Sequence, residues 1–208
     1  MKTDSHHILC VNPWIHDFAA FDFWAKPVGL LYIAAILREK GCSVSYIDCL
    51  DRFHSKEKEP DKIPWDGRGP YRKTGIALPE GLEDVNRTFS RYGIKPSWFK
   101  NDLRSIKKPD LIFVTSMMTY WASGVKETIE IIKEIYPDVP VVLGGVYASL
   151  CHDHAQKNTA ADMVVKGPAE TQLSGILKKY LGNDIKIDST FDTMPYPAFD
   201  LLNRITYI

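Results

Sequence analysis

Two apolar segments of this chain end in residues with small side chains, which could leave room for a ligand. One segment ends in Ser116 and leads to Met118. The other, Val141–Leu143, is followed by Gly144 and Gly145. Each segment follows a Pro or Asp turn signal and suits a buried parallel strand, and open α/β sheets bind ligands at the carboxyl ends of such strands. The two strand ends therefore predict a slot with small walls.

Each half of this pattern also has an ordinary structural explanation. A glycine pair after a strand is typical of a tight strand-to-helix turn, and a serine there is typical of a helix cap. Neither half alone separates these alternatives. Their occurrence together on neighbouring strands favours a ligand slot.

Two further loops are expected at the same edge of the sheet. Asn12, Pro13 and Trp14 lie at the end of the first predicted strand, and Gly167 and Glu170 follow the fifth. Because the carboxyl ends of parallel strands share one edge, these loops would border the same slot.

An aromatic cluster follows the first loop and contains Phe18, Phe21, Phe23 and Trp24. Such rings above a sheet edge could cover a flat macrocycle or dock a partner domain, and the alternative is ordinary core or lid packing. We expect Trp14 to join Phe18, Phe21 and Trp24 in an exposed apolar surface of the kind that marks an interface.

Several familiar chemistries lack their motifs. No Gly-x-Gly-x-x-Gly follows the first strand, no Walker loop is present and no Gly-x-Ser-x-Gly elbow occurs. Dinucleotide binding, P-loop chemistry and the usual α/β-hydrolase activity are therefore not indicated. His152 and His154 lie two residues apart, so on a helix their imidazoles point away from each other and a shared metal ion is not expected.

Charge and composition limit the classes of molecule that this chain is expected to bind. Lys plus Arg and Asp plus Glu number 26 each, so no basic excess favours nucleic acid or anionic lipid. No segment approaches a membrane span or a signal peptide. Of the cysteines, Cys10, Cys42 and Cys49 lie in or beside apolar strand patterns that predict burial, and Cys151 stands apart. We expect a reduced, cytoplasmic protein without nucleic-acid or membrane partners.

Strand and helix patterns alternate along the chain. The predicted strands are 7–12, 43–48, 111–116, 141–143 and 162–166, and the predicted helices are 28–40, 122–136, one from 147 and one that presents Leu173, Ile176, Leu177 and Tyr180 to the sheet. This alternation predicts an α/β fold with a doubly wound parallel sheet of the Rossmann-like, flavodoxin-like kind and strand order 2-1-3-4-5. A long insertion, about 51–108, interrupts it after the second strand, with short helices predicted at 82–92 and 97–107.

Short motifs span nearly the whole chain. They are Asn12-Pro13, Pro27-x-Gly29-Leu30-x-Tyr32-x-Ala34-x-x-Leu37, Gly41-x-x-Val44, Asp48, Pro109-Asp110-Leu111-Ile112, Ser116-x-Met118, Gly144-Gly145, Val165-x-Gly167-x-x-Glu170 and Met194-Pro195-x-Pro197-Ala198-Phe199-Asp200-Leu201-Leu202. On these motifs the chain resembles the N-terminal cobalamin-binding domain of cobalamin-dependent radical S-adenosylmethionine proteins, a superfamily that includes the magnesium-protoporphyrin cyclase type and related methyltransferases.

The resemblance implies a cobalamin site at the carboxyl edge of the sheet. Ser116 would hydrogen-bond the base of the nucleotide tail, and Met118 would pack on that base. Gly144 and Gly145 would let the tail lie close to the backbone. The mouth of the site would be lined by Asn12, Pro13, Trp14, Gly167 and Glu170.

Two departures qualify the resemblance. The first loop carries His16-Asp17 in place of the Asp-x-His-x-x-Gly motif of methionine-synthase-type domains, so we expect no protein histidine below the cobalt. The Cys-x-x-x-Cys-x-x-Cys motif for a 4Fe-4S cluster is missing. The cluster, S-adenosylmethionine and catalysis would therefore belong to a C-terminal radical domain, and no catalytic residue is expected in this chain.

The expected organisation is a cobalamin-binding-type domain over residues 1–189 and a linker over 190–208, cut off before the radical domain. The resemblance implies methyl transfer, or a radical rearrangement or cyclisation, by the intact enzyme. A cofactor-free interaction module that docks on the radical domain stays open as an alternative. A signalling receiver domain is disfavoured because Asn12-Pro13 stands where that family has clustered carboxylates, although Lys166 follows the fifth strand.

Overall fold

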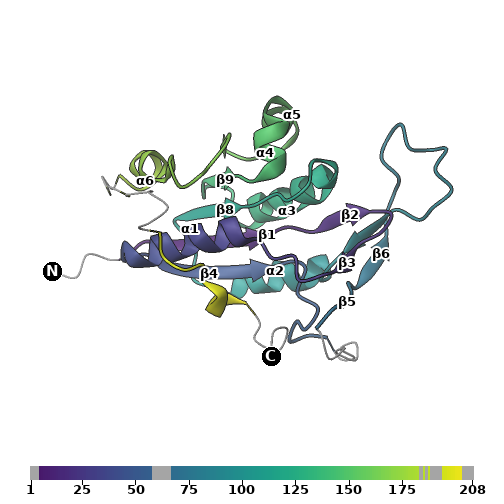
Figure 1. Cartoon of the computed structure of the whole chain (residues 1–208), viewed down its shortest axis with the longest axis horizontal. Coiled ribbons are helices and arrows are strands. Elements are labelled where there is room, and N and C mark those ends of the chain that lie inside the picture. The colour runs from purple at the N-terminus through teal and green to yellow at the C-terminus, as the bar shows by residue number, and fades with distance from the viewer. Residues whose placement is uncertain (1–4, 58–66, 183–184, 186, 188–193, 203–208) are drawn as a thin grey trace.

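The fold is built on one parallel sheet, seen in a computed structural model that describes residues 5–57, 67–182, 185, 187 and 194–202. Five strands lie in the order β10-β9-β8-β1-β4, and each neighbouring pair is parallel (Figure 1). Their bounds are Met163–Val164, Val141–Leu143, Leu111–Val114, His7–Asn12 and Ser43–Asp48. In chain order this is 2-1-3-4-5, which confirms the predicted fold class and strand order.

Helices cover both faces of the sheet because successive strand residues point to opposite sides. On one face α1 (Val28–Glu39) and α6 (Leu173–Leu181) pack on Ile8 and Cys10 of β1. On the other face α2 (Pro96–Ser105), α3 (Ala122–Ile135), α4 (Val146–Leu150) and α5 (His152–Asn158) pack on Leu9 and Val11. The doubly wound prediction is confirmed by these two cores. No helix among the described residues is long and apolar enough to cross a membrane.

The first loop and the insertion form two small sheets of their own. In one, β2 (Ile15–Asp17) pairs with β7 (Ser90–Tyr92), which also pairs with β6 (Lys73–Gly75). In the other, β3 (Phe21–Asp22) pairs with β5 (Gly69–Pro70). All three pairings are antiparallel. The loop after β1 is thereby tied to the insertion rather than left to cover the sheet edge alone.

One of the two helices predicted in the insertion is wrong. The segment 82–92 contains turns and then β7, whose buried, half-buried, buried pattern follows the twofold period of a strand. Pairing with β2 and β6 decides the conformation there, and β2 lies more than seventy residues away in sequence. The helix predicted at 97–107 is confirmed as α2.

The C-terminal segment packs on the domain. Residues 194–202 include a 3₁₀ helix, η3 (Phe199–Leu201), where the sequence predicted no regular element. The Ala198 N–H donates to the Leu31 carbonyl (3.1 Å), and Arg38 pairs with Asp200 (2.7 Å). The proposed boundary at 189 and the remainder of the predicted linker, 190–193 and 203–208, lie outside the described residues.

Candidate functional site

A cavity of about 460 Å³ opens between α1 and the carboxyl ends of the sheet strands. Its walls come from Gly29, Leu30 and Ile33 of α1, from the ends of β8 and β9, from α4 and from the loop Gly167–Glu170 after β10. The lining is mostly apolar, and its volume lies in the range of small-molecule sites. Four of the sequence-predicted site residues, Gly144, Gly145, Gly167 and Glu170, line this cavity.

The two adjacent glycines do different things in this wall. A Cβ built on Gly144 meets no heavy atom within 4 Å, so the missing side chain leaves space in the cavity. Gly145 has φ +94°, and a Cβ there would lie 2.7 Å from the Ser116 nitrogen and closer still to its oxygen. Gly144 therefore provides room, whereas Gly145 permits the close crossing of two strand ends.

Ser116 lies behind the cavity wall. Its buried hydroxyl donates to the Gly144 carbonyl (2.6 Å) and accepts from the Ala148 N–H (3.4 Å). Its carbonyl accepts from the Val146 N–H (2.7 Å). Ser116 thus fixes the ends of β8 and β9 together. Met118 is exposed beyond that crossing, and neither residue lines the cavity.

The loops after β9 and β10 are also joined through a side chain. The Ser149 hydroxyl donates to the Gly145 carbonyl (2.8 Å) and accepts from the Gly167 N–H (3.0 Å). Because these bonds tie α4 to the loop after β10, the cavity rim is preformed. Sequence analysis missed Ser149 and the α1 wall, although the Pro27-x-Gly29 motif pointed to the start of α1.

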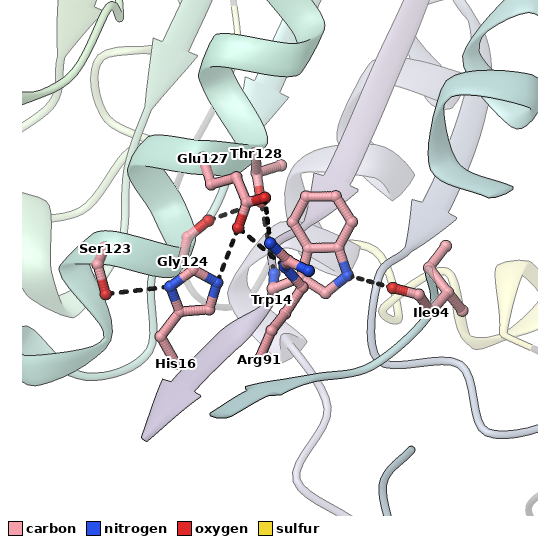
Figure 2. A network of polar contacts seen from close by, with 8 residues as sticks. All are labelled: Trp14, His16, Arg91, Ile94, Ser123, Gly124, Glu127 and Thr128. Atoms are coloured by element: carbon pink, nitrogen blue, oxygen red, sulfur yellow. Dashed lines mark hydrogen bonds and ion pairs between the residues drawn. The ribbon is translucent and has the colours of Figure 1, made fainter. Parts of the chain in front are cut away.

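The three residues predicted after β1 do not line the cavity. Asn12 is buried and its side-chain amide donates to the Asp48 carboxylate (2.8 Å). Pro13 is buried, and so is Trp14, whose indole N–H donates to the Ile94 carbonyl (2.8 Å; Figure 2). The expectation that Trp14 is exposed is wrong.

The burial of Trp14 depends on a close contact with α3. A Cβ on Gly124 would overlap the Trp14 carbonyl oxygen, so the missing side chain lets the first loop lie directly on the helix. The indole then turns inward and meets the Phe99 ring edge-to-face, with ring centroids 5.1 Å apart. Phe18 is half-buried, so only Phe21 and Trp24 of the expected aromatic surface are well exposed.

His16 belongs to a polar network that joins β2, β7 and α3 (Figure 2). Its Nδ1 contacts the Ser123 hydroxyl (3.2 Å) and its Nε2 contacts the Glu127 carboxylate (3.0 Å). Arg91 donates to both oxygens of the same carboxylate, at 2.9 and 2.5 Å. Burial opposes the charge on Glu127, but the bonds from His16 and Arg91 outweigh it and lower the pKa of Glu127.

A second cavity of about 500 Å³ lies on the α3 side, where His16, Ser123 and Phe89 meet Tyr147 and His154. His154 hydrogen-bonds the Tyr147 hydroxyl (2.8 Å). His152 instead contacts the Val164 carbonyl (3.2 Å), so the two histidines have different partners. Within the described residues, no group of three or more His, Cys, Asp or Glu side chains is placed to hold a metal ion.

The cysteines Cys10, Cys42 and Cys49 are buried, as predicted: Cys10 lies in β1, and Cys42 and Cys49 flank the two ends of β4. Burial raises the pKa of the Cys10 thiol to about 12. These thiols therefore behave as small core side chains.

A comparison with known families supports the interpretation of this site as a ligand slot. Residues 102–177 match the B12 binding domain. The match runs from within α2 into α6 and contains Ser116, Met118, Gly144, Gly145, Gly167 and Glu170. It supports a cobalamin-binding domain with the observed α/β fold. A search among curated proteins finds no match.

The B12 binding domain match and the cavity agree in position. All the cavity walls except that of α1 lie inside the matched residues. Space beside Gly144 and apolar walls suit a flat, largely apolar heterocycle such as the base of the cobalamin nucleotide tail. The residues present therefore fit this group.

Proposed function

We propose that this chain holds cobalamin for a radical S-adenosylmethionine enzyme, with the nucleotide tail in the cavity between α1 and the sheet. The observation that carries the proposal is the position of that cavity, at the carboxyl edge and within the B12 binding domain match. Bound cobalamin would supply a cobalt centre for methyl transfer or for a radical rearrangement or cyclisation.

The chain's own residues bind and orient the cofactor in this proposal. Gly144 leaves room for the tail base, and Leu30 and Ile33 of α1 pack against it from the opposite wall. Ser116 keeps the β8 and β9 ends at a fixed separation through its bond to Gly144. Gly167 and Glu170 border the mouth, where the ribose and phosphate of the tail would pass to solvent.

The proposal that a radical domain is the partner is supported by the resemblance of the sequence motifs. The motifs around Pro27, Gly144 and Gly167 are those of the domain that precedes radical domains in such proteins. The segment 194–202, which resembles the connection to the radical domain, lies against α1. The 4Fe-4S cluster and S-adenosylmethionine would belong to the radical domain.

A cavity-filling variant tests the site. We expect the purified chain to bind hydroxocobalamin at one equivalent and Gly144→Phe to weaken binding about tenfold or more, because the ring would enter the cavity. Gly175→Phe is the matched control, since its Cβ also meets nothing within 4 Å but it lies outside the cavity, on α6. Binding is measured by titration calorimetry, with circular dichroism to check both folds.

The outcomes separate the candidate functions. If Gly144→Phe binds hydroxocobalamin as tightly as wild type does, the nucleotide tail does not occupy this cavity. Absence of binding by the wild-type chain would favour the cofactor-free module that docks on the radical domain.

A further inference from the structure

Three aromatic side chains form an exposed platform just before α1. Phe21, Phe23 and Trp24 have 44%, 58% and 49% of their surface exposed, and the rings of Phe21 and Phe23 lie 4.8 Å apart between centroids. We call these three residues the aromatic platform. Single exposed apolar side chains are common, whereas a contiguous group of large rings is typical of a binding surface.

Buried charges hold the platform in place. Asp22, inside it, is almost fully buried, and its Oδ2 lies 3.5 Å from Lys26 Nζ and 3.7 Å from Arg52 Nη1. The Arg52 guanidinium also donates to the Gly67 carbonyl (2.8 Å) and to that of Arg68 (3.3 Å). The platform is therefore anchored to the insertion by a desolvated ionic cluster. Burying these charges costs solvation free energy, and their pairing fixes the geometry of the platform.

The backbone at the platform is also strained. Trp24 has φ +66°, a left-handed conformation that is unfavourable for a bulky side chain. The Asp22 carboxylate accepts the Trp24 N–H (2.9 Å) and so stabilises this turn. The Arg68 guanidinium lies over the Trp24 ring, 5.5 Å from its centroid. Strain of this kind is kept where the surrounding structure enforces it, and it clusters at ligand sites.

The platform is joined to the cavity wall through the start of α1. Four residues after Trp24 the chain enters α1 at Val28, which is exposed, and Gly29 already lines the cavity. On the opposite wall, Val146 and Leu150 of α4 are exposed as well. Figure 1 shows β3 at the side of the sheet where the arrows of β1 and β4 end. The platform and the exposed apolar residues Val28, Val146 and Leu150 thus lie at the same edge of the sheet.

We propose that the aromatic platform packs against the corrin ring of the cobalamin whose tail fills the cavity. This inference rests on the proposed function, because the tail fixes where the ring must emerge. The corrin macrocycle presents a broad conjugated face, with methyl and amide side chains around its edge. Aromatic rings pack favourably against such a face.

Replacement of the platform rings tests the inference. We expect Phe21→Ser/Phe23→Ser to bind hydroxocobalamin about tenfold more weakly than wild type, from the loss of two aromatic contacts. Binding of α-ribazole, the nucleoside of the tail without the corrin ring, would stay unchanged in this variant. Gly144→Phe would weaken the binding of both ligands, because the new side chain would enter the cavity that takes the tail.

Phe199→Ser is the matched control. Phe199 is 53% exposed on η3, beside Asp200, which pairs with Arg38 in the last turn of α1, far from Val28 in the first. This control should bind both ligands as wild type does. Equal affinity of the platform variant and wild type for hydroxocobalamin would overturn the inference. The aromatic platform would then be a surface that contacts a partner domain. Parallel weakening of α-ribazole would also overturn it, since the rings would then only shape the tail cavity. Absence of hydroxocobalamin binding by wild type would instead contradict the proposed function itself.

Discussion

Gly144 and Gly145 are neighbours with separate physical roles. Gly144 borders free space, whereas Gly145 combines a positive φ with a contact too close for any Cβ. The sequence predicted a small-walled slot from this pair and from Ser116. It did not reveal that Ser116 and Gly145 build the crossing behind the wall, because that depends on how two strand ends approach in space.

Alanine substitution separates these roles. We expect Gly145→Ala to lower the free energy of unfolding by about 2–4 kcal/mol, since the Cβ would overlap the Ser116 backbone in a strained conformation. Gly144→Ala should change it by about 0.5 kcal/mol or less. Urea denaturation of both variants measures the difference, and equal stabilities would refute the assigned roles.

His16 is placed away from the proposed cofactor tail. Both of its ring nitrogens have partners, Ser123 and Glu127, and it lines the second cavity rather than the first. We therefore expect no protein nitrogen on the cobalt. Electron paramagnetic resonance of reduced cobalamin bound to uniformly ¹⁵N-labelled protein should match the spectrum with unlabelled protein. A change in nitrogen splitting that His16→Ala abolishes would show that His16 is a ligand.

At the scale of elements, the network around Glu127 joins β2, β7 and α3. His16 and Arg91 come from strands more than seventy residues apart, and both bond one carboxylate on α3. The pKa of Glu127 is lowered from its ordinary value near 4.5. The stabilisation from its charge is therefore complete above that value and is lost as the pH falls through the lower pKa of the folded state.

A neutral isostere tests this coupling. We expect Glu127→Gln to lower the free energy of unfolding by about 1–3 kcal/mol at pH 7, because His16 and Arg91 lose a charged acceptor. The difference from wild type should shrink as the pH is lowered below about 5, where Glu127 in unfolded wild type takes up its proton. Chemical denaturation across this range measures it. A constant difference down to pH 3 would contradict the assigned charge.

The elements of the central sheet and helix α2 could be predicted, whereas the short strands of the insertion could not. Apolar strands followed by amphipathic helices give a local signal, so the five strands and their order emerge from periodicity. In contrast, β2 and β7 have three residues each and depend on a partner distant in sequence. The inward turn of Trp14 likewise depends on Gly124, more than a hundred residues later.

At the scale of the whole molecule, the candidate site assembles two parts of the chain. The B12 binding domain match supplies β8, β9, β10 and α4, and α1 supplies the opposite wall from outside the match. The sequence predicted the first part from small residues at strand ends. It missed Leu30 and Ile33 as wall residues because their apolar spacing is equally that of an ordinary core helix.

The most direct measurement compares cobalamin with cobinamide, which keeps the corrin ring but lacks the nucleotide tail. If the cavity beside Gly144 takes the tail, titration calorimetry of the wild-type chain should show hydroxocobalamin bound about a hundredfold more tightly than cobinamide. Equal affinities for the two ligands, or no binding of hydroxocobalamin, would contradict a cobalamin site in this cavity.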